Sequence, residues 1–137
     1  MQLRSMTIED YEKVYDLWSN TPGVGLSEAD EQHEINSFLE RNPGLFFVYE
    51  SFGEIIGTIL CGTDGRRGYI HHLVIKESYR GRGLGKQLVQ RCLDGLKKLN
   101  ILKCHLFVFA NNEIGKGFWS GTGWQRREDI LIYSKNI

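Results

Sequence analysis

The segment with the clearest chemical potential is a glycine-rich turn, Arg80-Gly81-Arg82-Gly83-Leu84-Gly85-Lys86. Alternating glycines let a backbone turn tightly and approach a ligand closely. The turn runs into a helical pattern of apolar residues, so it should end at a helix N-terminus, where unpaired N–H groups and the helix dipole attract anions. Arg80, Arg82 and Lys86 add positive charge. The sequence therefore predicts a phosphate-binding site, and a diphosphate fits such a nest of amides.

The two common phosphate-binding motifs do not describe this turn. A Walker A loop has a glycine, four residues and then Gly-Lys-Ser/Thr, but Arg80 stands where that first glycine belongs and Gln87 replaces the Ser/Thr. A dinucleotide fingerprint has the spacing GxGxxG, whereas Gly81, Gly83 and Gly85 give GxGxG. The remaining alternative is a glycine-rich connection with solvated arginines. Glycine spacing, basic residues and the strand-to-helix context together favour the anion site.

Two adjacent histidines, His71 and His72, lie in a β-rich stretch, Tyr69–Ile75, just before the turn. An imidazole can remove a proton from a reacting group near neutral pH, although a lone histidine in a strand is more often structural. Side chains alternate between the two faces of a strand. We therefore expect His71 and His72 to point to opposite faces.

Hydrophobic periods and turn residues predict the elements that position these groups. Thr7 is a candidate helix N-cap with Asp10 three residues on, and Ser27 begins a second helix with an acidic first turn. The predicted strands are Gln2–Ser5, Leu45–Ser51, Glu54–Gly62, Tyr69–Ile75, Ile101–Phe109, Trp124–Arg127 and Ile130–Tyr133. The predicted helices are Ile8–Trp18, one that begins at Ser27 and is ended by Asn42-Pro43-Gly44, Leu84–Leu96 and Asn112–Ser120.

The order of these elements, β-αα-βββ-α-β-α-ββ, predicts an α/β fold with a mixed sheet (α+β). Hairpins in the first half imply antiparallel pairing, and the β-α-β unit in the second half implies a parallel pair, with helices on both faces. The chain has 137 residues, and no linker or repeat divides it. We expect one domain, residues 1–137.

Composition narrows the function classes. Lys plus Arg and Asp plus Glu each number 17, and this balance disfavours a dedicated nucleic-acid binder. The three cysteines, Cys61, Cys92 and Cys104, form no CxxC pair, so we expect reduced thiols and neither a metal site nor a disulfide framework. There is no apolar leader, and no stretch approaches the ~20 apolar residues of a membrane span. We therefore expect a cytoplasmic protein that engages no membrane.

Two segments together resemble one protein family. Arg80-x-x-Gly83-x-Gly85 resembles the Q/R-x-x-G-x-G/A motif of the GCN5-related N-acetyltransferase (GNAT) superfamily, and Asn112–Trp124 resembles its second signature, an Asn leading into a helix with an aromatic pair. The resemblance is to small bacterial members of unassigned substrate. It implies a single-domain GNAT fold, splayed between the fourth and fifth strands, and an enzyme that transfers acetyl from acetyl-CoA to a primary amine.

The resemblance also implies where coenzyme A binds. Its pyrophosphate would lie on backbone amides of the glycine-rich turn, and its pantetheine arm along Leu73-Val74-Ile75, where the N–H of Leu73 or Val74 polarises the thioester carbonyl. Asn112 would bond the arm. The residues implied to bind the cofactor are Leu73, Val74, Ile75, Arg80, Gly81, Arg82, Gly83, Leu84, Gly85, Lys86 and Asn112.

A catalytic base is needed because a protonated amine has no lone pair with which to attack. The family places bases at positions equivalent to Tyr69 and His71, so the resemblance implies His71 as the base. His72 and Glu50 are the alternatives.

The general acid departs from the family pattern. Trp119 occupies the position where the family commonly has a tyrosine that protonates the departing thiolate. An indole N–H can form a hydrogen bond but cannot act as an acid near neutral pH. Trp119 is thus a candidate cofactor contact, and Tyr133, Tyr79 or water could supply the proton, since a thiol with a pKa of about 8.5 is a tolerable leaving group.

Two rival functions follow from the same residues. The missing tyrosine favours a non-catalytic acyl-CoA-binding module or sensor with the same fold. The arginine pairs Arg66-Arg67, Arg80 with Arg82, and Arg126-Arg127 could serve a nucleic-acid or protein-interaction domain, although neutral net charge disfavours this. For the enzyme, the acceptor is a small-molecule or protein amine, and the protein is a monomer or a homodimer.

Overall fold

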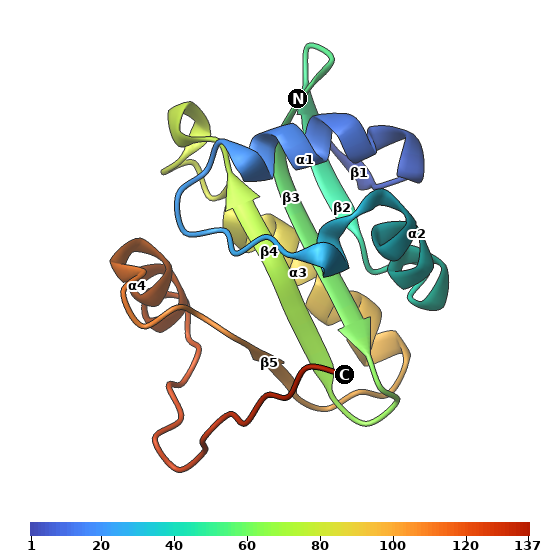
Figure 1. The fold of residues 1–137 in the computed structure, drawn as a ribbon. Helices are drawn as coiled ribbons and strands as arrows, with labels where there is room; N and C mark the ends of the chain where they lie inside the picture. The colour runs from blue at the N-terminus through green and yellow to red at the C-terminus, as the bar shows by residue number, and fades with distance from the viewer. The chain divides into compact units, whose positions relative to one another are not determined.

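Antiparallel pairing builds most of the sheet, because tight turns join strands that follow one another in sequence. The computed structural model describes residues 1–137, which form two units, Met1–Phe107 and Val108–Ile137. The first unit holds a five-stranded sheet with the strand order β1-β2-β3-β4-β5 (Figure 1). Its strands are β1 (Gln2–Ser5), β2 (Phe47–Ser51), β3 (Glu54–Thr63), β4 (Gly68–Ile75) and β5 (Cys104–Leu106). Only β4 and β5 pair in parallel.

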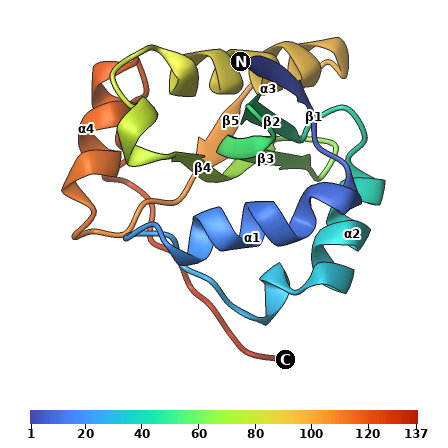
Figure 2. The same cartoon turned by 90° about the horizontal axis from the view of Figure 1, so that it is seen from above.

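Helices cover both faces of this sheet, as the element order predicts. Figure 2 shows α1 and α2 on one face and α3 on the opposite face. The helices of the first unit are α1 (Tyr11–Ser19), α2 (Gln32–Arg41) and α3 (Leu84–Lys98), with the short 3-10 turns η1 (Ile8–Asp10), η2 (Glu28–Asp30) and η3 (Glu77–Tyr79). The second unit contains α4 (Glu113–Gly121). No helix has both the length and the apolar content needed to span a bilayer.

The core of the first unit has two layers because each sheet face packs against its own helices. On the α1 and α2 side, Trp18 is 1% exposed and its indole N–H donates to Thr58 Oγ1 at 2.9 Å. On the α3 side, Leu88 is fully buried. A Cβ at Gly68 would lie 2.4 Å from Leu96, so a glycine at this point of β4 lets α3 lie close to the sheet.

The N-cap predicted at Thr7 is confirmed, and its partner Asp10 does more than cap. Asp10 accepts the Thr7 backbone N–H at 2.9 Å. Both of its carboxylate oxygens also accept hydrogen bonds from the Arg4 guanidinium, at 2.8 and 2.9 Å. Arg4 further donates to Glu50 on β2 at 3.0 Å, so the Arg4 guanidinium joins β1 to β2 and to the turn that precedes α1.

Two predicted boundaries differ from the structure. The helix predicted from Ser27 is interrupted, because Glu31 is extended at φ −64° and ψ 155°, which separates η2 from α2. The strand predicted over Ile101–Phe109 is reduced to Cys104–Leu106, the three residues that pair with β4.

The two strands predicted at Trp124–Arg127 and Ile130–Tyr133 are not formed, so that prediction was wrong. High β-propensity describes a side chain that fits a half-buried pleated surface, and it produces a strand only beside a hydrogen-bonding partner. Neither segment pairs with another strand. The segment instead carries local ion pairs, Arg126 with Glu128 at 2.8 Å and Arg127 with Asp129 at 2.9 Å.

We predict that Asp10→Asn lowers the free energy of unfolding at pH 7 by about 2 kcal/mol, the size of a lost hydrogen bond to a charged group. The Arg4 hydrogen bonds hold the pKa of Asp10 below its ordinary 3.8. Its stabilisation is therefore complete above that ordinary value and is lost as the pH falls through the lower folded pKa. Urea unfolding of the wild type and the variant at neutral and acidic pH measures the free-energy difference under each condition.

The matched control is Glu9→Gln, which removes an exposed carboxylate from the same turn. We expect this control to unfold like the wild type. A destabilisation of Asp10→Asn that does not shrink in acid would contradict the role of the Arg4 pair.

Candidate active site

The glycines of the turn adopt conformations that other residues rarely accept. Gly81 and Gly83 have φ of 78° and 79°, in the left-handed region. A Cβ at either position would meet nothing within 4 Å, so the backbone here is open to a ligand. Gly83 is the N-cap of α3. The predicted strand, turn and helix N-terminus are therefore confirmed as a continuous unit.

The backbone amides of this turn have no acceptor within the protein. Upstream, the Arg80 N–H donates to Glu77 O at 3.2 Å, and downstream the Gln87 N–H donates to Gly83 O at 3.2 Å. Between them, the amides of residues 81–86 form no hydrogen bond with protein. Unpaired donors at a helix N-terminus, with the dipole behind them, are suited to the oxygens of a diphosphate.

The basic side chains of the turn flank these amides. The Arg80 Nε–H donates to the carbonyl of Ile75 at 2.9 Å, which ties the turn to the end of β4. The Arg82 guanidinium lies over the Tyr79 ring, 5.0 Å from its centroid. Lys86 is exposed. The turn thus presents cations and amide donors together.

Strand β4 contains one residue more than its partner. Thr58 pairs with Val74 and Leu60 pairs with His71, so Ile59 alone stands opposite both His72 and Leu73. His72 has φ 47°, which is uncommon for a residue other than glycine. This is a β-bulge, a feature that locally redirects side chains and interrupts pairing.

The bulge brings both histidine rings to one face of the sheet. The His71 ring lies 5.7 Å from the Phe38 ring of α2, and the His72 ring lies 4.6 Å from the Trp18 ring of α1. Helices α1 and α2 cover the same face (Figure 2). The prediction that the two histidines point to opposite faces was therefore wrong, because strict alternation takes no account of an inserted residue.

The bulge also coincides with the end of the pairing between β4 and β5. The last parallel pair is Ile70 with Leu106, although β4 continues to Ile75. The sheet is therefore open between its fourth and fifth strands, as predicted. Beyond the bulge, the Lys76 N–H donates to Ile56 of β3 at 2.8 Å. Because successive N–H groups of a strand point to opposite sides, those of Leu73 and Ile75 face the open edge and that of Val74 faces β3.

A hydrogen-bonded network holds the bulge from the α1 and α2 side. His72 Nε2 lies 2.7 Å from Asp30 Oδ1, and Asp30 Oδ2 accepts the Ser27 N–H at 3.0 Å. The hydroxyl of Thr58 donates to the carbonyl of His72 at 3.0 Å. Asp30 is 6% exposed. The sequence placed Asp30 only in the acidic first turn of the helix predicted from Ser27, and the one local signal of its role was the S-x-x-D spacing from Ser27.

His71 differs from His72 in having no polar partner. Neither of its ring nitrogens forms a hydrogen bond within the protein. Burial lowers the pKa of His71 below its ordinary 6.5, and the neighbouring His72 adds to this, while Asp30 opposes it. The ring is therefore neutral at physiological pH and has a lone pair with which to accept a proton.

Other residues proposed for catalysis are already engaged. Glu50 of β2 accepts a hydrogen bond from Arg4 at 3.0 Å, and β3 lies between β2 and β4, so Glu50 is not a free base beside the histidines. The Tyr79 hydroxyl lies 3.4 Å from Ser51 Oγ.

The remaining predicted residues belong to the second unit, Val108–Ile137. Asn112 caps α4 by accepting the Gly115 N–H at 3.0 Å. The Trp119 ring lies 4.9 Å from the rings of both Phe118 and Trp124. Tyr133 is 89% exposed. Their parts in a common site stay predictions.

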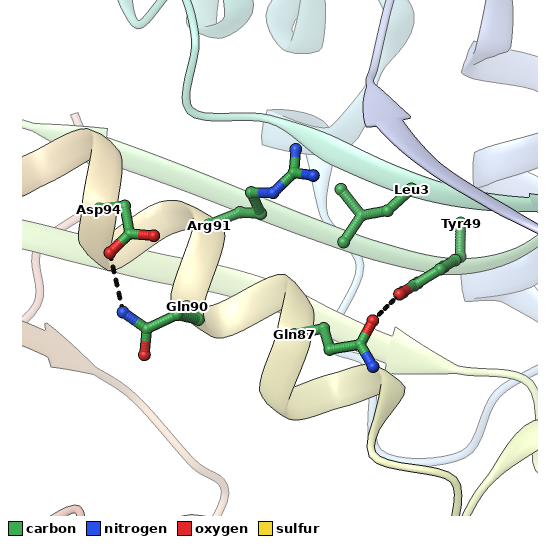
Figure 3. A pocket seen from close by; sticks show the side chains of 6 residues that line it. All are labelled: Leu3, Tyr49, Gln87, Gln90, Arg91 and Asp94. Atoms are coloured by element: carbon green, nitrogen blue, oxygen red, sulfur yellow. Dashed lines mark hydrogen bonds between the residues drawn. The ribbon is translucent and has the colours of Figure 1, made fainter.

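A hollow lies on the α3 side of the sheet (Figure 3). The Tyr49 hydroxyl of β2 donates to the Gln87 side chain of α3 there. Residues Leu3, Tyr49, Gln87, Gln90, Arg91 and Asp94 line it. Because both histidines lie on the other face, this hollow is separate from the candidate site.

Comparisons with known proteins agree on one family. Residues 11–124 match the acetyltransferase (GNAT) family. An acetyltransferase of Pectobacterium atrosepticum is 32% identical over 137 residues, which cover 100% of this chain and 96% of that protein.

Two solved structures share the fold at lower sequence identity. Aminoglycoside 6′-N-acetyltransferase AAC(6′)-IG of Acinetobacter haemolyticus has a TM-score of 0.80 at 16% identity, covering 100% of this chain and 99% of that one. PaiA N-acetyltransferase of Thermoplasma acidophilum, solved with coenzyme A, has a TM-score of 0.76 at 23% identity, covering 89% and 87%. With a family match that spans most of its length, the chain belongs to the acetyltransferase (GNAT) family.

Proposed function

We propose that the protein transfers an acetyl group from acetyl-CoA to a primary amine by direct attack in a ternary complex. The observation that carries the proposal is the run of unpaired amides at residues 81–86, which matches the diphosphate of coenzyme A in charge and in hydrogen-bonding capacity. The binding of coenzyme A by the related PaiA fold supports the same cofactor. The family match crosses the boundary at Phe107, which supports one functional domain over residues 1–137.

In this proposal the diphosphate binds the amides of Arg82, Gly83, Gly85 and Lys86. The pantetheine arm follows the open edge of β4 at Leu73-Val74-Ile75, and Asn112 bonds it. The orientation of β4 beyond its bulge favours Leu73 over Val74 as the donor to the thioester carbonyl. Such a donor is often worth roughly 3 kcal/mol of transition-state stabilisation.

We propose His71 as the base. It removes a proton from the acceptor ammonium, and the freed nitrogen lone pair attacks the thioester carbonyl carbon. The nitrogen loses its second proton to water, the C–S bond breaks, and coenzyme A leaves as a thiolate. That thiolate takes its proton from Tyr133 or water, while Trp119 contacts the cofactor arm. The lowered pKa and unpaired nitrogens of His71 support this assignment.

The proposed acceptor is a primary amine, small or protein-borne. The fold neighbour AAC(6′)-IG is an aminoglycoside acetyltransferase, which supports small cationic amines as the first compounds to test. The rival function, an acyl-CoA sensor, is favoured by Trp119 in the acid position. Thiol release across an amine panel separates the two, since a sensor would bind acetyl-CoA and release no thiol.

We predict that Gly83→Glu abolishes acetyl-CoA binding, measured by calorimetry. The added carboxylate would face the diphosphate, and a side chain at φ 79° is strained. The strain alone costs about 1–3 kcal/mol of stability. If Gly83→Glu lowers only the melting temperature and binds acetyl-CoA with wild-type affinity, the turn is not part of the cofactor site.

The matched control is Gly65→Glu. Gly65 has φ 90° and, like Gly83, has nothing within 4 Å of the position that a Cβ would occupy. It lies in the turn before β4, whereas Gly83 follows β4. We expect the same strain but unchanged acetyl-CoA affinity.

We predict that His71→Ala lowers turnover at about pH 7 by roughly 10²-fold or more, the usual contribution of a general base. The loss should shrink at about pH 10, where much of the amine is already uncharged. Thiol release over a pH series measures it. His33→Ala is the control, because His33 is an exposed histidine of α2 with a side chain 71% accessible. An equal loss at every pH would argue against a base.

A further inference from the structure

The buried contact between Asp30 and His72 is not explained by cofactor binding or by proton transfer at His71. It joins two segments 42 residues apart, η2 and the bulge of β4, through a distance of 2.7 Å. The two side chains are 9% and 17% exposed. A buried carboxylate is costly unless its oxygens are paired, and both oxygens of Asp30 are used, one by His72 and one by the Ser27 N–H.

Further contacts fix both ends of this pair. The Tyr11 hydroxyl donates to the Asp30 carbonyl at 2.6 Å, which holds η2 against α1. At the other end, Trp18 packs on the His72 ring, and its indole bonds the same Thr58 hydroxyl that donates to the His72 carbonyl. The ring and the backbone of the bulge residue are therefore both held.

The held residue directly precedes the proposed oxyanion donor and directly follows the proposed base. His72 occupies a conformation, φ 47°, that persists only where the surroundings determine it. If His72 relaxed to ordinary extended geometry, the alternation beyond it would reverse. The Leu73 N–H would then turn away from the open edge. The neighbouring His71 ring would also lose its place against Phe38.

We propose that Asp30 is a positioning residue for acetyl transfer, acting through His72. It clamps the bulge so that the Leu73 N–H faces the open edge and His71 stays free as the base. In this assignment His72 moves no proton during the reaction. The inference rests on the proposed function and adds the residue that keeps its donor and base in register.

The test compares Asp30→Asn, His72→Gln and His72→Ala with Tyr11→Phe. Asp30→Asn removes the charge and one of the two acceptors. Gln keeps an N–H near the position of His72 Nε2 but cannot act as a base. Tyr11→Phe removes a hydrogen bond to the carbonyl of Asp30 and leaves its carboxylate intact.

We expect Asp30→Asn and His72→Ala to lower kcat by roughly 10- to 100-fold, since a misplacement of about 1 Å can cost 10²-fold. The calorimetric affinity for acetyl-CoA should fall much less than kcat, because the turn at residues 81–86, which holds the diphosphate in the proposed function, is untouched. His72→Gln should retain most of kcat. Tyr11→Phe, which leaves both contacts of the Asp30 carboxylate in place, should lose far less than Asp30→Asn. In the His72→Ala background, adding Asp30→Asn should cost nothing more.

Three outcomes overturn the proposal. If Asp30→Asn keeps the full kcat, Asp30 has no positioning role. If the losses of Asp30→Asn and His72→Ala add in the double variant, Asp30 does not act through His72. A His72→Gln as inactive as His72→Ala makes His72 the base instead.

Hydrogen exchange separates this inference from the proposed function. Faster amide exchange of residues 71–75 in Asp30→Asn than in Tyr11→Phe supports the clamp without any activity measurement. If the wild type releases no thiol but residues 71–75 still exchange faster in Asp30→Asn than in Tyr11→Phe, acetyl transfer is refuted and the clamp is not. Unchanged exchange in Asp30→Asn would refute the clamp.

Discussion

One inserted residue in β4 determines how the site is built. The extra residue at His72–Leu73 opposite Ile59 turns both histidine rings to the α1 and α2 face and turns the Leu73 N–H to the open edge. Pairing with β5 ends one residue before the histidines, at Ile70. A regular strand would have placed the two histidines on opposite faces of the sheet. The grouping of the histidines and the direction of the Leu73 N–H thus have a single physical origin.

The glycine-rich turn supplies the second half of the site through backbone chemistry. Its amides at residues 81–86 are left without protein acceptors, because α3 begins there and no side chain caps it. Arg80 links the turn to the last residue of β4 through the Ile75 carbonyl. The anion-binding amides and the open strand edge are therefore held together by one short covalent and hydrogen-bonded path.

Local signals in the sequence predicted much of this arrangement. The cap at Thr7, the hairpins of β2 to β4 and the start of α3 after Gly83 all depend on neighbouring residues, and all are confirmed. The bulge was missed because nothing in Ile70-His71-His72-Leu73 marks an inserted residue. Asp30 was missed because its partner is 42 residues away. The strand predicted at Ile130–Tyr133 was wrong because β-propensity alone does not specify which strand would pair with it.

The most direct test is a titration with acetyl-CoA followed by the amide chemical shifts of the assigned protein. Binding to unpaired donors perturbs those donors most. The account predicts large shifts at residues 81–86 and at Leu73, with Gly65 and the residues around Tyr49 and Gln87 unaffected. Shifts concentrated at the Tyr49–Gln87 hollow, or no shifts in the folded protein, would contradict it.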